Sequence, residues 1–459
     1  MLSDYLINPT SIMSTAQKSY KSAFALLATL FFMWGFITVL VDALVPRLKD
    51  VFELSYGQSI MVQFAFFGAF FCFAIPSSFL LEKIGYQRGI VTGLCIMGIA
   101  CLLFYPAASY REFWIFITAF FTLAAGITLL QVAANPYVTL LGDERTASSR
   151  LNLSQAFNSF GTLLAPIAGA LFLLSDTVMG SQAISTLSEP DKVNYYASEA
   201  LTVQEPFLII AGVLFTLAAV FGFTKLPSLL KPAPKGGYVK LLANRRFLLG
   251  VLGIFMYVGA EVSIGSFLVN YFEELQVVNA IKSSEFLSGL SSFLLVGKDI
   301  TEVDSKAILG SFVTLYWGGA MIGRFAGAFL MRFISSAKLL MIFGLLAIAM
   351  IVLSISSTGI MAMFCILAVG LFNSIMFPTI FSLALDGLDN LKAQASGLLV
   401  MGIVGGAFIP KIVGTIADAF GTDIDGNATG TGLSVAFIAL LLCYGYIVYY
   451  GASKRNVQA

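Results

Sequence analysis

The sequence predicts an all-α integral membrane protein with twelve transmembrane helices, arranged as two six-helix bundles related by pseudo-two-fold symmetry. The first indication is composition, since 58% of the 459 residues are hydrophobic and only 11% are charged, against about 25% charged residues in soluble proteins. The second is length, because twelve apolar stretches each reach the roughly 20 residues that cross a bilayer as a helix. The third is a repeat of motifs between the two halves of the chain.

The first six apolar stretches fill the N-terminal half and predict one bundle over residues 22–225. Residues 1–21 form a polar segment that we expect to be a cytoplasmic tail. This segment lacks the apolar region and cleavage site of a signal peptide, so the first stretch is expected to stay in the protein. The six predicted helices lie near 22–46, 57–81, 88–108, 113–141, 150–174 and 205–225.

Residues 226–243 predict a cytoplasmic linker between the bundles. The segment from Lys225 to Arg246 contains five Pro or Gly residues and six basic residues but no acidic residue, a composition typical of loops. The second bundle is predicted over 244–451, followed by a cytoplasmic tail at 452–459. Its six helices lie near 244–272, 307–332, 337–355, 359–386, 393–417 and 430–451.

The basic residues predict the orientation, because Lys and Arg favour cytoplasmic loops. With both termini inside, 17 of the 26 Lys and Arg residues fall in cytoplasmic segments, eight fall outside and Arg324 lies within a predicted helix. The distribution therefore favours cytoplasmic termini in a multi-pass protein of the plasma (inner) membrane. The long loops near 175–204 and 273–306 then lie outside, where their mixed polar residues meet solvent.

Helix-interrupting residues recur at matching places in the two halves. Such a repeat is typical of transporters whose substrate site lies at the membrane midplane between two bundles. The matches, at offsets of 242 or 244 residues, are Gln131 with Asn373, Pro136 with Pro378, Gly161 with Gly405 and Pro166 with Pro410.

Two carboxylates inside predicted helices, Asp42 in the first and Glu261 in the seventh, are the strongest functional signal. A carboxylate at the centre of a membrane helix costs about 2.5 to 3.5 kcal/mol on insertion scales, and a bound cation or polar substrate would offset that cost. We therefore predict that Asp42 and Glu261 couple transport to an ion. The alternative for each is a protonated carboxyl group in a hydrogen bond between helices.

Amides, hydroxyls and aromatic rings also recur inside the predicted helices. Trp34, Thr38 and Asp42 follow at intervals of four residues and so share one helix face. These groups suit a sugar, whose hydroxyls need donors and acceptors and whose C–H face packs on aromatic rings. The alternatives are hydrogen bonds between helices for the amides and packing for the tryptophan. The predicted substrate-binding residues are Trp34, Thr38, Gln131, Asn135, Gln155, Asn158 and Asn373.

Several functional classes are disfavoured by what the sequence lacks. Histidine, the commonest general base and metal ligand, is absent, and no acidic residues are paired at metal-ligand spacing. The five cysteines lie in apolar stretches without CxxC spacing, which predicts packing rather than a zinc site. We therefore expect no enzyme, no metal site and no cofactor, and no basic patch indicates nucleic-acid binding.

Two motifs in the fourth and fifth predicted helices, Gln131 to Pro136 (QVAANP) and Gln155 to Asn158 (QAFN), are specific enough to suggest a family. Together with Trp34-Gly35, the Glu82 to Arg88 turn and Gly323-Arg324-Phe325, they resemble the fucose:proton symporter family of the major facilitator superfamily. Within it, the chain is most similar to the glucose/galactose transporter branch, and the matches cover most of its length.

The resemblance implies the major facilitator superfamily fold and uptake of a monosaccharide, foremost a glucose- or galactose-type hexose, by cation-coupled symport through alternating access. A sugar, a coupling cation and membrane lipid are then the partners, and we expect a monomer. The family's first-helix aspartate corresponds to Asp42, a coupling or gating carboxylate, but its fourth-helix acid falls on the neutral Gln131. Either Glu261 supplies that acid from the other half, or the ion is sodium rather than a proton. The alternatives are the same fold carrying fucose or an N-acetylated hexosamine, and a sugar sensor that does not translocate.

Overall fold

The computed structural model describes residues 20–40, 56–110, 112–172, 188–234, 236–295, 297–301, 303–421 and 431–458. Throughout this part of the chain the regular elements are helices. Asp42, the predicted coupling residue of the first helix, lies outside the described residues.

The N-terminal half forms one bundle. Its α2 contains two predicted helices that meet at Gly85, whose φ of 83° is a left-handed conformation that glycine adopts without steric cost. The chain therefore turns between these two helices at a single residue. The elements are the first helix Tyr20–Leu40, α2 Tyr56–Tyr110, α3 Phe113–Leu140, η1 Glu144–Thr146, α4 Ala147–Phe172 and α6 Glu189–Phe223.

The C-terminal half forms the second bundle and begins with a short helix in the predicted linker. Its elements are α7 Gly237–Ala243, α8 Arg245–Glu274, α9 Val278–Ser283, α10 Glu285–Leu294, α11 Ser305–Leu330, α12 Ser336–Ser356, α13 Gly359–Asn373, α14 Met376–Leu385, η2 Asp389–Leu391, α15 Lys392–Met401, η3 Gly402–Val404, α16 Gly405–Gly421, α17 Gly432–Ala436 and α18 Ile438–Gln458. The tenth predicted helix is thus α13 with α14, the eleventh is α15 with α16, and the twelfth is α17 with α18.

The described residues make twelve membrane crossings, as predicted. Nine helices among them are long and apolar enough to cross a bilayer, and one of these, Phe64–Tyr110, contains Gly85 and therefore crosses twice. The other two crossings are α4 and α11, which have 26 residues each, a length that spans a bilayer. Both carry polar side chains that bind other helices, such as Asn152 on α4 and Arg324 on α11.

Both predicted outer loops contain helix where the sequence analysis followed only apolar runs. α6 begins at Glu189, well before residue 205, because the Ser188 side chain accepts a hydrogen bond from the Asp191 amide and caps the helix. α9 and α10 occupy much of 273–306, and the Ser284 side chain caps α10. Such capping signals start helices outside the membrane as well as within it, so hydropathy alone missed these segments.

Repeat-related glycines make the same close contact in the two bundles. A Cβ atom on Gly161 of α4 would overlap the Phe32 carbonyl oxygen of the first helix, and one on Gly405 would overlap the Phe255 carbonyl oxygen of α8. The fifth crossing therefore packs backbone to backbone on the first, as the eleventh does on the seventh. The internal repeat predicted from Gly161 and Gly405 is thus present in the packing.

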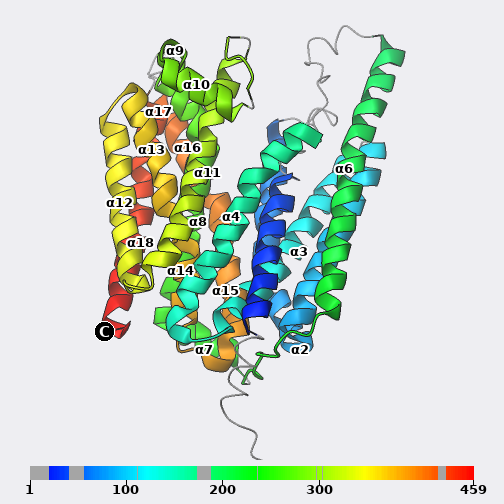
Figure 1. Cartoon of the computed structure of the whole chain (residues 1–459), viewed down its shortest axis with the longest axis vertical. Coiled ribbons are helices and arrows are strands. Elements are labelled where there is room, and N and C mark those ends of the chain that lie inside the picture. The colour runs from blue at the N-terminus through cyan, green and yellow to red at the C-terminus, as the bar shows by residue number, and fades with distance from the viewer. Residues whose placement is uncertain are drawn as a thin grey trace, which may run out of the picture.

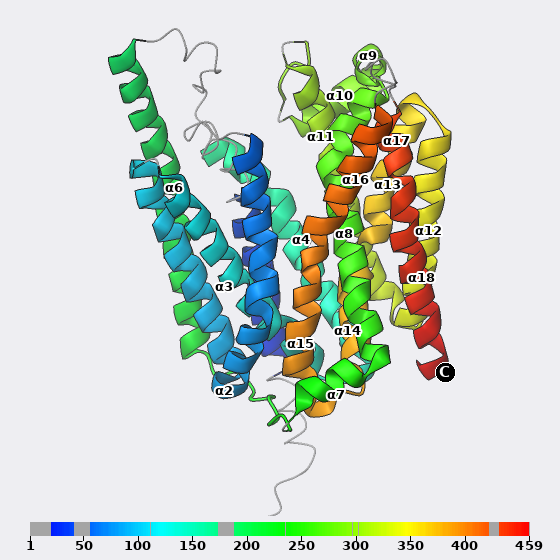
Figure 2. The same ribbon diagram turned by 180° about the vertical axis from the view of Figure 1, so that it is seen from behind.

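The two bundles converge at the end where α7 lies, which we call the linker end, and diverge toward the end where α9 and α10 lie, which we call the far end (Figures 1 and 2). Contacts between bundles are made chiefly by α4 with α11 and by α2 with α15. The structure is thus held together at the linker end.

Candidate functional site

The predicted amides of the N-terminal bundle come together between α3 and α4. Gln131 and Asn135 lie one turn apart on α3, and both are buried together with Gln155 of α4. Gln155 Nε2 donates a long hydrogen bond of 3.5 Å to Asn135 Oδ1, while Asn135 Nδ2 is buried without a partner. Buried amide groups are nearly always hydrogen-bonded, so this unpartnered donor marks a position where a polar ligand or water would bind.

The first helix contributes an aromatic ring and a hydroxyl to the same bundle. Trp34 is 8% exposed and its ring packs on Phe31 at a centroid distance of 5.5 Å. Thr38 Oγ1 is buried without a hydrogen-bond partner. Asn158 differs from the other amides, because its Nδ2 donates to the Phe31 carbonyl at 3.0 Å. Asn158 thus fastens α4 to the first helix in this state.

A second polar cluster lies inside the C-terminal bundle, around Glu261 of α8. Asn373, at the end of α13, is fully buried and its Nδ2 donates to the Tyr316 hydroxyl of α11 at 2.7 Å. Glu261 interacts with the Tyr257 hydroxyl one turn earlier and with Tyr444 of α18. Glu261 Oε1, Asn373 Oδ1 and the Tyr257 and Tyr444 hydroxyls have no hydrogen bond of good geometry. The cluster therefore offers several unsatisfied polar atoms.

Arg324 of α11 joins the two clusters. Its Nη1 donates to the Ser159 hydroxyl and, at 3.5 Å, to the Gln155 carbonyl on α4, while its Nε donates at 3.0 Å to the Ser374 carbonyl. It also interacts electrostatically with Glu261. One guanidinium group therefore donates to α4 of the N-terminal bundle and lies within electrostatic range of Glu261 in the other bundle.

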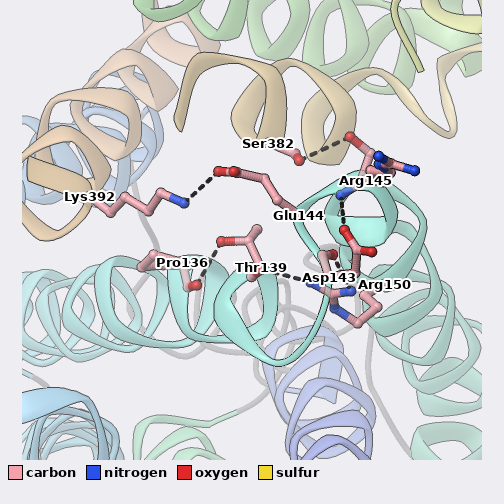
Figure 3. Close-up of polar contacts among 9 residues, drawn as sticks. Pro136, Thr139, Asp143, Glu144, Arg145, Arg150, Ser382 and Lys392 are labelled. Carbon is pink, nitrogen blue, oxygen red and sulfur yellow. Dashed lines mark hydrogen bonds and ion pairs between the residues drawn. The ribbon is translucent and has the colours of Figure 1, made fainter. Parts of the chain in front are cut away.

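The linker end is closed by polar contacts between bundles. Lys392 at the start of α15 forms an ion pair of 3.0 Å with Glu144 of η1 (Figure 3). Ser148 and Ser382 hydroxyls lie 2.9 Å apart, and Asn152 Nδ2 donates to Thr379 Oγ1 at 3.1 Å. These contacts bring α4 and α14 together at this end.

Arg150 shapes the turn that presents Glu144 to Lys392. Its guanidinium donates to the Thr139 carbonyl at 2.7 Å and to the Asp143 carbonyl at 2.8 Å, which ties the start of α4 to the end of α3 (Figure 3). Asp143 Oδ1 in turn accepts a hydrogen bond from the Arg145 amide at 2.9 Å. The turn is thus fixed by its own hydrogen bonds.

Tyr238 of α7 fastens the linker to the N-terminal bundle. Its hydroxyl is hydrogen-bonded to the Ser78 hydroxyl of α2, and its ring packs on Phe79 at a centroid distance of 5.0 Å. Burial raises the pKa of the Tyr238 phenol, so the hydroxyl keeps its proton. The α7 helix is therefore held against α2 as well as leading into α8.

Sequence reasoning did not single out Arg324, Tyr316 or Tyr444 as members of the site. Arg324 was visible as a charge inside a predicted helix, a rare feature that usually marks function. The two tyrosines gave no such signal, because a tyrosine in a membrane helix also serves for packing. Among the described residues, no group of three His, Cys, Asp or Glu side chains could hold a metal ion.

Comparison with known proteins places this arrangement in a family. Residues 23–410 match the sequence profile of the Major Facilitator Superfamily. The chain belongs to this superfamily. It is 44% identical over 447 residues to a glucose/galactose transporter of Brucella abortus, with 97% of each chain covered. It is 43% identical to a putative glucose/galactose transporter of Helicobacter pylori, with 92% of this chain and 94% of the relative covered.

More distant members of the same family are symporters. The L-fucose-proton symporter of Escherichia coli is 32% identical over 414 residues, covering 88% of this chain and 89% of the symporter. A crystal structure of the major facilitator superfamily transporter FucP in the outward conformation superposes with a TM-score of 0.81 at 30% identity, covering 95% of this chain and 99% of that one. The protein is therefore a multi-pass membrane transporter of the fucose:proton symporter family and not an enzyme.

Proposed function

We propose that the protein imports a glucose- or galactose-type hexose together with a proton across the plasma (inner) membrane. The observation that carries this proposal is the set of buried, unpartnered polar atoms contributed by both bundles, Thr38 Oγ1 and Asn135 Nδ2 from one and Glu261 Oε1 and Asn373 Oδ1 from the other. The names of the relatives at 43% and 44% identity support the choice of sugar.

In this proposal the sugar binds between the clusters of the two bundles. A hexose presents hydroxyls that both donate and accept hydrogen bonds, so it needs amide, carboxyl and hydroxyl partners on several sides. Gln131, Asn135 and Gln155 offer these from the N-terminal bundle, and Asn373 offers them from the other. Asn158 positions α4 through its bond to the Phe31 carbonyl. Trp34 and Thr38 complete the substrate-binding side of the first helix.

The proposed cycle places the linker end in the cytoplasm, as the distribution of basic residues indicates. The contacts between Glu144 and Lys392 and between Ser148 and Ser382 hold the bundles together at this end, which supports our assignment of a state open to the outside. The resemblance to FucP in its outward conformation supports this assignment. Import then requires these contacts to break while the far ends of the bundles approach each other.

Asp42 and Glu261 are proposed as the ion-coupling residues, and a proton as the ion. The relatives named as proton symporters support the proton. The neutral amide of Gln131 stands in the fourth helix, so we assign the second coupling acid to Glu261. Its electrostatic interaction with Arg324, which donates to the Gln155 backbone carbonyl, supports this assignment. Symport requires the sugar and the ion to raise each other's affinity, because coupling free energies are reciprocal.

Uptake by membrane vesicles tests the function directly. The panel comprises glucose, galactose, fucose and N-acetylglucosamine, and the pH gradient and the sodium gradient are imposed separately. We expect uphill accumulation of glucose and galactose under the pH gradient alone. Accumulation driven by the sodium gradient alone would show that the coupling ion is sodium rather than a proton. Specific sugar binding without counterflow in proteoliposomes would identify the protein as a sensor instead of a transporter. Asp42→Asn should abolish uphill accumulation but keep sugar counterflow.

A further inference from the structure

Pro378 leaves a carbonyl group without its helical partner in the middle of the tenth crossing. In an α-helix the carbonyl of residue 374 would accept from the amide of residue 378, but proline has no amide proton. The chain breaks there into α13 and α14, with Ser374 between them. An unpaired buried carbonyl costs free energy, so another donor is required.

Arg324 supplies that donor and uses the same group to reach the other bundle. Its Nε donates to the freed Ser374 carbonyl at 3.0 Å, which fixes the guanidinium plane. Nη1, on the same rigid plane, then points to the Ser159 hydroxyl and the Gln155 carbonyl on α4. Arginine suits this task because its donors form a fixed fork. One side chain therefore bridges α11, the α13–α14 break and the opposite bundle.

Glu261 interacts electrostatically with this guanidinium. Among the described residues, which exclude Asp42, it is an acid within electrostatic range of Arg324, and the two side chains form no ion pair. In the described part of the chain, the other titratable groups around Glu261 are Tyr257 on its own helix, Tyr316 on α11 and Tyr444 on α18. Lys411 of α16, which packs against α8, lies instead over the Phe64 ring of α2. Among the described residues, Arg324 is thus the cation that interacts electrostatically with Glu261.

We propose that Arg324 is a positioning residue that links the charge on Glu261 to the closure between the bundles, an inference that rests on the proposed symport. With Glu261 neutral, Arg324 stays on Ser159 and the Gln155 carbonyl and holds the linker end closed. With Glu261 ionised, the carboxylate draws the guanidinium into its own bundle, the contact with α4 is lost and the linker end opens more readily. A proton without sugar is thereby kept from crossing alone.

Distance measurements between spin labels test this assignment without any sugar or gradient. In a background with the five cysteines replaced, labels at the exposed Lys83 of α2 and Lys338 of α12 report the separation of the bundles at the linker end. Arg324→Gln should lower the ratio of closed to open molecules about tenfold, since hydrogen bonds to charged groups are typically worth that factor or more. Glu261→Gln should raise the ratio, and the double variant should match Arg324→Gln alone.

Two further variants separate positioning from a general loss of structure. Ser159→Ala removes one of the two acceptors on α4 and leaves the Gln155 carbonyl in place. It should shift the ratio in the same direction as Arg324→Gln, even if that variant folds poorly. Arg332→Gln, at an exposed arginine beyond the end of α11, should leave the ratio unchanged. The proposal is overturned if Ser159→Ala leaves the ratio unchanged, or if Glu261→Gln shifts it equally with and without Arg324. Wild-type uptake, measured separately, decides the proposed function itself.

Discussion

Ser396→Ala should destabilise the closed state of the transporter, because it removes the hydrogen-bond donor of the Val132 carbonyl, which lacks a donor within its own helix. Pro136 in α3 lacks an amide proton, so the Val132 carbonyl one turn earlier has no partner within its helix. Ser396 of α15, in the other bundle, donates to it at 2.9 Å. Pro136 and Pro378 occupy matching positions of the internal repeat. In each case the carbonyl that loses its helical partner accepts a hydrogen bond from a side chain at the contact between the bundles, Ser396 in the first case and Arg324 in the second.

The expected size of this effect follows from the burial of both groups. Val132 and Ser396 are fully buried, and leaving a buried acceptor unsatisfied costs about 1 to 3 kcal/mol. Water reaches the Val132 carbonyl when the bundles separate, so the cost falls on the closed state alone. The ratio of closed to open molecules should therefore fall by about 5-fold to about 150-fold, using about 1.4 kcal/mol per factor of ten.

Spin-label distances at Lys83 and Lys338 measure this ratio, and a second substitution tests the cause. Pro136→Ala supplies an amide proton for the Val132 carbonyl, so the double variant Pro136→Ala with Ser396→Ala should regain much of the loss. Ser453→Ala is the matched control, because its hydroxyl donates to the Tyr450 carbonyl within the continuous helix α18. If Ser396→Ala alone leaves the distances unchanged, or the double variant is no better than the single one, the reasoning from the freed carbonyl is wrong.

Three other predictions concern coupling, packing and the closing ion pair. Glu261→Gln should abolish uphill accumulation of sugar while sugar counterflow persists, and loss of both in a folded protein would contradict a coupling role. Gly161→Ala should lower the free energy of unfolding in detergent by about 1 to 3 kcal/mol, because its Cβ would overlap the Phe32 carbonyl oxygen. Gly212→Ala is the control, because its Cβ would meet nothing within 4 Å. Equal stability of the two variants would refute the close packing. Lys392→Gln should change the free-energy difference between the closed and open states by no more than about 1 kcal/mol, because Glu144 is 60% exposed. The change should be smaller at high salt. A larger change that does not depend on salt would show that the ion pair is buried in the working protein.

The sequence by itself determined the fold class and the positions of most helices. Apolar length depends on local composition alone, so α3, α8 and α12 begin and end within a few residues of the predicted ranges. The helical stretches before α6 and between α8 and α11 were missed, because capping groups such as Ser188 rather than hydropathy start them. The internal repeat was also predicted from the sequence, because Gly161 and Gly405 occupy matching positions in the two halves. In the structure both glycines pack against a backbone carbonyl oxygen of a neighbouring helix.

The sequence also marked the polar residues inside the helices, since any such group in a membrane stands out against its apolar neighbours. Only the tertiary structure decided which of them meet. Arg324 and Ser159 are separated by 165 residues, and Ser396 and the Val132 carbonyl by 264. Pro136 and Pro378 show in the sequence that two carbonyls lose their helical donors, but the replacement donors come from distant helices. Which end of the transporter is closed depends on those donors, and so it is fixed by how the two bundles pack.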